Sequence, residues 1–197
     1  EFAREEDSQG FRGTGSPYIG IFNHAEVAPV VMATGKTSFV DAELEDYRDL
    51  ITAIPSNLLG SSAFFMNRYI WADVQKKKQN GQSVVSFQNP VTPISDLQSY
   101  TPLQPIGILW GFPVILSDVL PDLTEDAVST DFTVFGSLPR GMFFGDRQSM
   151  TVRISEDATV DGVSMFQGLG SAVRLHERVG LEIVLHKALT NLRTAAS

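Results

Sequence analysis

Short apolar runs, set apart by glycine, proline and polar residues, follow one another along most of the chain. Runs of this length between turn-forming residues predict β-strands. The predicted strands cover residues 27–32, 63–66, 106–110, 114–116, 132–135, 142–144 and 150–154. Residues 82–105 are rich in Ser, Gln, Asn and Pro, and predict an exposed loop with one edge strand at residues 84–87.

Apolar residues recur at helical spacing in two places between these strands. The first helix has Ser38 or Asp41 as its N-cap and stops at Pro55. Its apolar face consists of Leu44, Tyr47, Leu50, Ile51 and Ile54. The second helix starts after Asn67 and ends at Asn80-Gly81. Residues 1–9 predict the end of a further helix, and the glycine-rich residues 10–20 predict an ordered loop.

Residues 166–192 are ambiguous between helix and strand. Their apolar positions are odd-numbered, namely Val173, Leu175, Val179, Leu181, Ile183 and Leu185. A period of two favours one long strand. Helices among many strands, without regular βαβ alternation, predict an α+β fold class with a mixed sheet and flanking helices.

The amino-acid composition argues against several classes of protein. A chain of 197 residues with 43% hydrophobic content is long enough to bury a core, as one domain or two small lobes. No apolar run approaches about 18 residues, so neither a membrane span nor a secretory leader is predicted. The absence of cysteine excludes disulfides and thiolate catalysis. The net charge of −8 argues against general affinity for nucleic acid, because phosphates would be repelled.

Two glycine-containing segments invite comparison with nucleotide-binding loops. Gly35-Lys36-Thr37 lacks the earlier glycine of a phosphate loop, because position 30 is Val30. It therefore predicts a turn before a helix. Gly13-Thr14-Gly15-Ser16 follows a helix end rather than a strand, so it predicts loop geometry and not a dinucleotide site.

The charged clusters have simpler interpretations than catalysis. His24, His176 and His186 lie in unrelated contexts, without metal-ligand spacing. Lys76-Lys77-Lys78 is expected in the last helical turn, where it complements the helix dipole. His176 and Arg178 are expected on one face of a strand, with Glu177 on the other. The carboxylates at residues 5–7 and 41–46 are expected to be solvated. We therefore predict no catalytic, cofactor-binding or metal-binding residue, and no enzyme.

Five sequence segments follow one another in a characteristic order along the chain. They are the acidic helix end with Gly13-Thr14-Gly15-Ser16-Pro17, then Ala63-Phe64-Phe65-Met66-Asn67-Arg68, Leu109-Trp110-Gly111-Phe112-Pro113-Val114, Phe143-Phe144-Gly145-Asp146-Arg147, and Arg174-Leu175-His176-Glu177-Arg178-Val179-Gly180-Leu181. In this order the chain resembles the Hong Kong 97-type major capsid proteins of tailed bacteriophages. In that family a spine helix ends in an acidic stretch and a Gly-Thr-Gly-x-Pro loop.

The resemblance implies a two-lobed protomer. An axial lobe would hold residues 21–148 and 181–197, gathered around five-fold and six-fold axes. An elongated peripheral lobe would hold residues 1–20 and 149–180, as a helix end with long strands. The family's N-terminal arm, extended loop and most of the spine helix would precede Glu1. Because those elements latch neighbouring subunits, this 197-residue chain is expected to assemble poorly alone.

The function implied is that of a structural subunit of an icosahedral phage capsid. Its main partner would be itself, in hexamers and pentamers, with a portal, a scaffold and a maturation protease as further partners. Packaged DNA would be contacted only non-specifically, and no membrane is implied. The expected location is the virion, after assembly in the cytoplasm of the bacterial host.

Some members of the family join their subunits through a Lys–Asn isopeptide bond promoted by a buried Glu. Aligned on Glu177-Arg178, the promoting position falls at His176 and the Asn position near Leu169. Because the carboxamide is missing, the resemblance predicts no autocatalytic crosslinking.

Two alternatives remain open on the sequence. The first is an encapsulin, which resembles the phage capsid proteins in fold but encloses enzymes rather than a genome. A small α+β hydrolase or nucleotide-binding enzyme would need a convergent polar pocket, which the sequence does not indicate.

Overall fold

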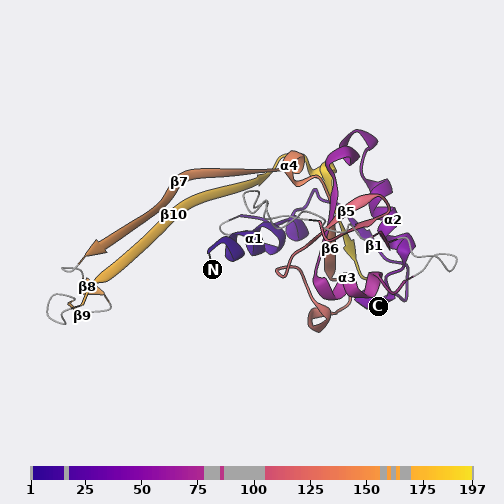
Figure 1. The fold of residues 1–197 in the computed structure, drawn as a ribbon, viewed down its shortest axis with the longest axis horizontal. Helices are drawn as coiled ribbons and strands as arrows, with labels where there is room; N and C mark the ends of the chain where they lie inside the picture. Colours follow the sequence, from indigo (N-terminus) through magenta and orange to yellow (C-terminus); the bar gives the residue numbers. More distant parts are fainter. Residues whose placement is uncertain are drawn as a thin grey trace, which may run out of the picture. The chain divides into compact units, whose positions relative to one another are not determined.

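The computed structural model describes residues 2–15, 18–77, 85–86, 105–155, 159–160, 163–164 and 170–196. The chain divides into two compact units (Figure 1). Unit 1 consists of Glu1–Phe143 and Ile183–Ser197, and unit 2 of Phe144–Glu182. The chain passes from one unit to the other within two strands, β7 (Met142–Ser155) and β10 (Ala172–Ile183).

Unit 1 is built on a mixed seven-stranded sheet. In spatial order its strands are β1 (Pro29–Val31), β11 (Leu189–Arg193), β6 (Asp131–Gly136), β2 (Ala63–Met66), β5 (Phe112–Leu116), β4 (Gly107–Leu109) and β3 (Val85–Ser86). β1 runs parallel to β11 and β2 parallel to β5, whereas the other neighbours are antiparallel. With helices packed beside this sheet, the predicted α+β class is confirmed.

Four α-helices and five short 3₁₀ turns join the described strands. The α-helices are α1 (Phe2–Arg12), α2 (Leu44–Ala53), α3 (Arg68–Val74) and α4 (Leu138–Gly141). The 3₁₀ turns are η1 (Ile21–Asn23), η2 (Phe39–Asp41), η3 (Ser56–Ser61), η4 (Leu123–Glu125) and η5 (His186–Ala188). In the described part of the chain, none of these helices has the length and apolar character needed to cross a bilayer.

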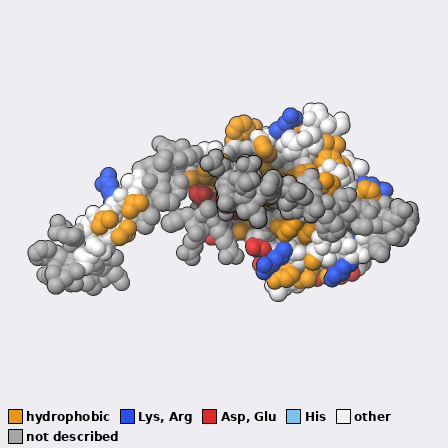
Figure 2. All heavy atoms as spheres, in the orientation of Figure 1, with side chains coloured by type: hydrophobic (Ala, Val, Ile, Leu, Met, Phe, Trp, Pro, Cys, Tyr) orange, Lys and Arg blue, Asp and Glu red, His pale blue; other side chains and the backbone are white. Residues whose placement is uncertain are grey.

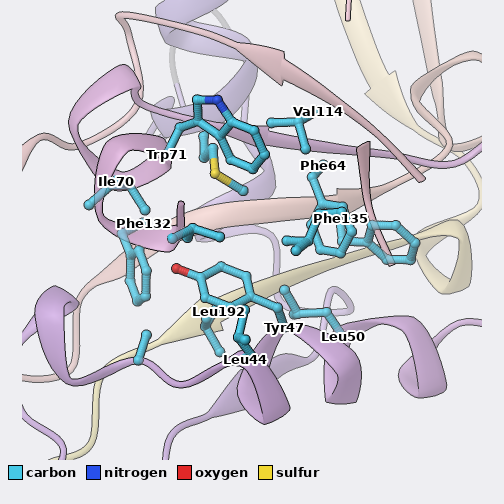
Figure 3. Close-up of a cluster of buried hydrophobic side chains, with 14 of the residues drawn as sticks. Leu44, Tyr47, Leu50, Phe64, Ile70, Trp71, Val114, Phe132, Phe135 and Leu192 are labelled. Carbon is cyan, nitrogen blue, oxygen red and sulfur yellow. The ribbon is translucent and has the colours of Figure 1, made fainter. Parts of the chain in front are cut away.

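The core of unit 1 is aromatic and lies between the sheet, α2 and α3 (Figure 3). Phe64 of β2 lies 4.4 Å from Phe135 of β6, measured between ring centroids. Tyr47 of α2 meets Phe64 edge-on at 6.4 Å. Burial raises the pKa of the Tyr47 phenol, and the nearby charges of Asp73 and Asp46 raise it further. This buried cluster contains no described residue of unit 2.

The opposite face of the sheet is partly covered by α1. Because side chains alternate along a strand, Phe65 points away from Phe64. Its ring lies 6.0 Å from that of Phe11 in α1. Residues 2–15 thus pack on unit 1 in this chain, and the expected assignment of residues 1–20 to a peripheral lobe stays a prediction.

Several predicted boundaries were wrong for identifiable reasons. α1 continues through Gly10 to Arg12, so the loop begins three residues later than expected. The Asn23 carboxamide donates to the carbonyls of Arg12 (2.9 Å) and Gly13 (3.1 Å), which satisfies acceptors left free where the helix ends. The distant Asn23 therefore stabilises a helix end that local spacing does not reveal.

Neither Ser38 nor Asp41 caps α2. They cap η2 instead, where the Asp41 carboxylate accepts the Ser38 N–H at 3.1 Å. The N-cap of α2 is Glu43, whose N–H donates to the Asp46 carboxylate at 2.7 Å. The predicted stop before Pro55 is confirmed, because α2 ends at Ala53.

The helix after Asn67 begins as predicted but ends early. The Asn67 side chain accepts the Tyr69 N–H at 3.2 Å, which confirms the cap. α3 then ends at Val74, whereas Asn80-Gly81 lies outside the described residues. Residues 142–144 and 150–154, predicted as two strands, form the single strand β7.

Unit 2 consists of a long two-stranded ribbon, formed by β7 and β10, and a short hairpin. β7 and β10 run side by side in opposite directions (Figure 1). The short strands β8 (Thr159–Val160) and β9 (Val163–Ser164) pair antiparallel. The long strand favoured within residues 166–192 is confirmed as β10.

Candidate assembly surfaces

The segment Gly35-Lys36-Thr37 forms a turn, as predicted. Gly35 has φ +93°, a conformation that favours glycine, and the Lys36 N–H donates to the Ala33 carbonyl at 3.0 Å. The Lys36 ammonium lies 2.9 Å from the Asp46 carboxylate. Burial opposes charge on Lys36, but the hydrogen bond and charge of Asp46 outweigh it and raise the Lys36 pKa. Lys36 is thus tied to the helix α2 rather than presented to a phosphate.

The glycine loop after α1 is also structural. A Cβ on Gly13 would lie 2.5 Å from the carbonyl oxygens of Gln9 and Tyr18, so only glycine fits. The Gly20 N–H donates to the Gly13 carbonyl at 2.8 Å, and Thr14 forms an isolated antiparallel β-bridge with Ile19. In these contacts, backbone groups of the loop pair with one another.

Two of the histidines are closer together than the sequence suggested. His24 Nδ1 accepts the Glu26 N–H at 3.3 Å, and the Glu26 carboxylate lies 3.1 Å from His186 Nδ1. The side chain of His176 lies outside the described residues. No set of three or more potential ligands that could hold a metal occurs within the described ranges.

The lysine triplet does not lie in the last turn of α3, because the helix ends before it. Lys77 Nζ lies 2.8 Å from the Asp73 carboxylate and donates to the Val40 carbonyl at 2.8 Å. It also donates to the Ala42 carbonyl. Lys77 therefore joins the end of α3 to η2, and Lys78 lies outside the described residues.

One surface groove is acidic. It has a volume of about 490 Å³ and lies between α1 and the segment 118–125. The charged residues that line it are Glu5, Arg12, Asp118, Asp122 and Glu125. Arg12 pairs with Glu125 at 3.0 Å, and hydrogen bonds from Thr124 lower the Asp122 pKa. Negative charge therefore predominates in this groove.

A second groove, of about 580 Å³, is largely apolar. It lies on the face of the sheet that carries Phe65, with Ala63 and Ile115 in its wall. Leu138 and Pro139 of α4 border it, and no charged residue is among those that line it.

The β7–β10 ribbon exposes large hydrophobic side chains. Ile154 is 70% exposed, and Val152 and Val173 are each more than half exposed. Hydrophobic side chains are visible along the ribbon in Figure 2. An isolated two-stranded ribbon is marginally stable in water. An apolar face of this kind commonly marks an interaction surface.

Among the described residues, the structure therefore presents two grooves and an exposed apolar ribbon as candidate surfaces. The charged groups singled out by the sequence hold turns and helix ends in place. The two grooves were missed, because a concave surface joins residues far apart in the sequence. The long strand β10 was predicted, but the exposure of the ribbon's apolar side chains was not. The only local signal for the ribbon was its period-two pattern.

The fold is that of known capsid proteins. The capsid of an empty GTA particle matches with a TM-score of 0.68 and 21% identity, covering 99% of this chain and 63% of that one. The Gordonia phage Cozz structure matches with a TM-score of 0.62 and 17% identity, covering 100% and 60%. An encapsulin complex from Synechococcus elongatus matches with a TM-score of 0.56 and 14% identity, covering 98% and 61%. The chain thus spans less than two thirds of the length of these proteins.

The sequence itself gives the family. Residues 1–193 match the phage capsid family, so the chain belongs to that family. No curated protein matches the sequence significantly. Together with the similar structures, this confirms the Hong Kong 97-type fold predicted from the five segments.

Proposed function

We propose that this chain is the major capsid subunit of a tailed bacteriophage, which assembles as hexamers and pentamers into an icosahedral shell around DNA. The observation that carries the proposal is the family match over residues 1–193. The architecture supports it, because unit 1 has its own core while unit 2 exposes an apolar ribbon. Repeated contacts between such subunits add up to a stable container without a catalytic site.

In this proposal, unit 1 forms most of the axial lobe around the five-fold and six-fold axes. The ribbon belongs to the peripheral lobe, where its apolar face is buried by elements of the assembled protein. The predicted lobe boundaries at residues 148/149 and 180/181 lie a few residues from those between the two units. Axial and peripheral placement can be tested in a reconstruction of the shell.

Partners and location follow from the same proposal. A portal, a scaffold and a maturation protease would act during assembly in the host cytoplasm, and the mature location is the virion. The negative balance of charge limits contact with packaged DNA to a non-specific kind. No membrane and no cofactor are part of the proposed function, and we propose no enzymatic activity.

The second candidate is an encapsulin, which the similarity to the Synechococcus elongatus complex favours. The phage capsid proposal is better supported, because the family match covers nearly the whole chain. Genes for a portal, a protease and a terminase beside this gene would support the phage proposal. A neighbouring gene for a cargo enzyme would support the encapsulin.

Gradient sedimentation of the product of the complete reading frame tests the proposal. The expected result is a fast-sedimenting fraction of shell size that contains this chain as its main protein. A product found only as a monomer or a small oligomer, at protein concentrations and salt conditions varied over a wide range, would exclude a shell-forming subunit.

A further inference from the structure

The ribbon has two chemically different faces. Side chains alternate along β7, so Val152 and Ile154 share one face while Arg153 points to the other. On β10 the same alternation separates Val173 from Arg174. Arg153 and Arg174 are both exposed, and neither forms an ion pair with any residue in the described part of the chain.

Contacts near the start of the ribbon indicate that the two arginines lie on the same face. The Val184 N–H donates to the Gly141 carbonyl at 2.9 Å, and a Cβ on Gly145 would lie 3.8 Å from the Gly180 carbonyl. Both contacts fit one antiparallel register. Continued along the strands, that register places Val152 opposite Val173, and directly opposed residues share a face. Among the described side chains, one face therefore carries Val152, Ile154 and Val173, and the other, called the cationic face below, carries Arg153 and Arg174, with Glu182 eight residues from Arg174 near the end of β10.

The same chain carries a surface of opposite charge. Among the described residues, the acidic groove beside α1 is lined by four carboxylates and one guanidinium, Arg12, which is paired with Glu125. Arg68, outside this lining, lies 3.9 Å from the Asp118 carboxylate in an exposed pair, so carboxylates still outnumber guanidinium groups there. Glu5 and Asp118 are exposed on its walls. In a shell built from one kind of subunit, every ribbon meets the surfaces of other copies of the same chain.

We propose that the cationic face of the ribbon, with Arg153 and Arg174, docks against the acidic groove of a neighbouring copy of this chain. The inference rests on the proposed shell function and identifies one of its subunit interfaces. Guanidinium groups suit this contact, because they form paired hydrogen bonds with carboxylates. Such charge pairing gives register and specificity between subunits more than raw affinity.

DNA is the competing occupant of the cationic face. The net charge of −8 repels a polyanion from the protein as a whole, whereas the acidic groove attracts the ribbon specifically. The charge balance of the chain therefore favours a protein surface over nucleic acid as the partner.

Charge reversal in the product of the complete reading frame tests the inference. One variant carries Arg153→Glu and Arg174→Glu in the ribbon, and another carries Glu5→Lys and Asp118→Lys in the groove. Each is expected to raise the protein concentration needed for half-maximal assembly at least about fivefold, the effect of two exposed ion pairs. The effect should diminish at high salt, because exposed charges are then screened.

Mixing distinguishes a contact between copies from one within a chain. In an equimolar mixture of the two variants, a reversed ribbon can meet a reversed groove of opposite charge, so assembly should recover partly. A chain that carries all four changes should assemble like the unmodified protein. If the fourfold variant assembled normally but the mixture did not assemble better than either variant alone, the contact would lie within one chain. That result would overturn the inference. Loss of binding to a short DNA duplex on ribbon reversal, with assembly unchanged, would overturn it in favour of DNA.

The matched control carries Arg48→Glu and Lys187→Glu, which change the net charge by the same amount as the ribbon variant, at exposed positions that belong to neither surface. It should assemble like the unmodified protein, and circular dichroism should show that all variants are folded. Shells that form equally well in all variants would overturn this inference alone. Absence of shells in the unmodified protein would instead contradict the proposed function.

Discussion

At the scale of single residues, backbone geometry makes some positions intolerant of any side chain. Gly136 ends β6 with φ +152°, and a Cβ there would lie 2.2 Å from the Ala188 carbonyl oxygen. The close approach brings η5 against the sheet, where the Ser137 N–H donates to that same carbonyl at 3.0 Å. Gly136 thus fixes the junction at which the chain re-enters unit 1 from the ribbon.

Gly136→Ala is expected to reduce the free energy of unfolding by about 3 kcal/mol or more, from steric overlap and an unfavourable backbone conformation. Urea denaturation followed by circular dichroism measures the change. Gly60→Ala is the control, because no atom lies within 4 Å of a Cβ there. Equal stability of the two variants would refute the steric explanation.

Tyr47 is expected to make the stability of unit 1 sensitive to alkaline pH. Its pKa is raised in the folded state, so above about pH 10 the unfolded chain loses a proton that the folded chain keeps. The stability gained from the neutral phenol is complete below pH 10 and is lost as the pH rises, by up to about 1.4 kcal/mol per pH unit. Between pH 8 and pH 11, the urea midpoint should fall less steeply with pH for Tyr47→Phe than for the unmodified protein. Identical slopes would contradict this prediction.

At the scale of elements, unit 1 should fold without the ribbon. Its buried core includes none of the residues of unit 2 whose side chains the structure describes, and Gly145 and Gly180 face each other at the start of the ribbon. Replacing residues 146–179 by an Asn-Gly turn should close the two strands as a short hairpin. A cooperative thermal transition within a few degrees of that of the intact chain is expected. Its loss would show that unit 2 contributes to the stability of unit 1.

The elements also show what could be predicted from the sequence. β2 and β6 were predicted from short apolar runs between turn-forming residues, and the apolar face of α2 from its helical spacing. The end of α1 and the cap of α2 were not, because they depend on Asn23 and on the Glu43–Asp46 hydrogen bond. β7 was divided in the prediction because Gly145 resembles a breaker, whereas pairing with β10 carries the strand through it.

The candidate surfaces were less predictable than the fold. The acidic groove joins α1 to residues more than a hundred positions later, so no local pattern could indicate it. The interpretation of the scattered histidines and lysines as structural residues was made from their sequence contexts, and the absence of a chemical site stays a prediction. The resemblance to capsid proteins predicted a role in a shell. It could not say which surfaces of this chain meet in a shell.

At the scale of the whole molecule, assembly is expected to remain non-covalent. The position near Leu169 offers no carboxamide for an isopeptide bond, although this position and the side chain of His176 lie outside the described residues. Assembled protein boiled in detergent should therefore run as a single band at the mass of one subunit. Covalent ladders in that gel would show that another pair of residues forms a crosslink.

The 197-residue chain alone is expected to assemble poorly, because it spans less than two thirds of the length of the capsid proteins that it resembles. Its sedimentation should show monomers or small oligomers under conditions in which the product of the complete reading frame forms large particles. Closed shells of normal size from the 197-residue chain would contradict that expectation.

Cryo-electron microscopy of the product of the complete reading frame tests whether the protein is a shell-forming capsid subunit. The expected result is closed icosahedral shells in which unit 1 surrounds the five-fold and six-fold axes and the β7–β10 ribbon lies at the periphery of each capsomer. Particles without icosahedral order, or a discrete small oligomer in place of shells, would contradict it.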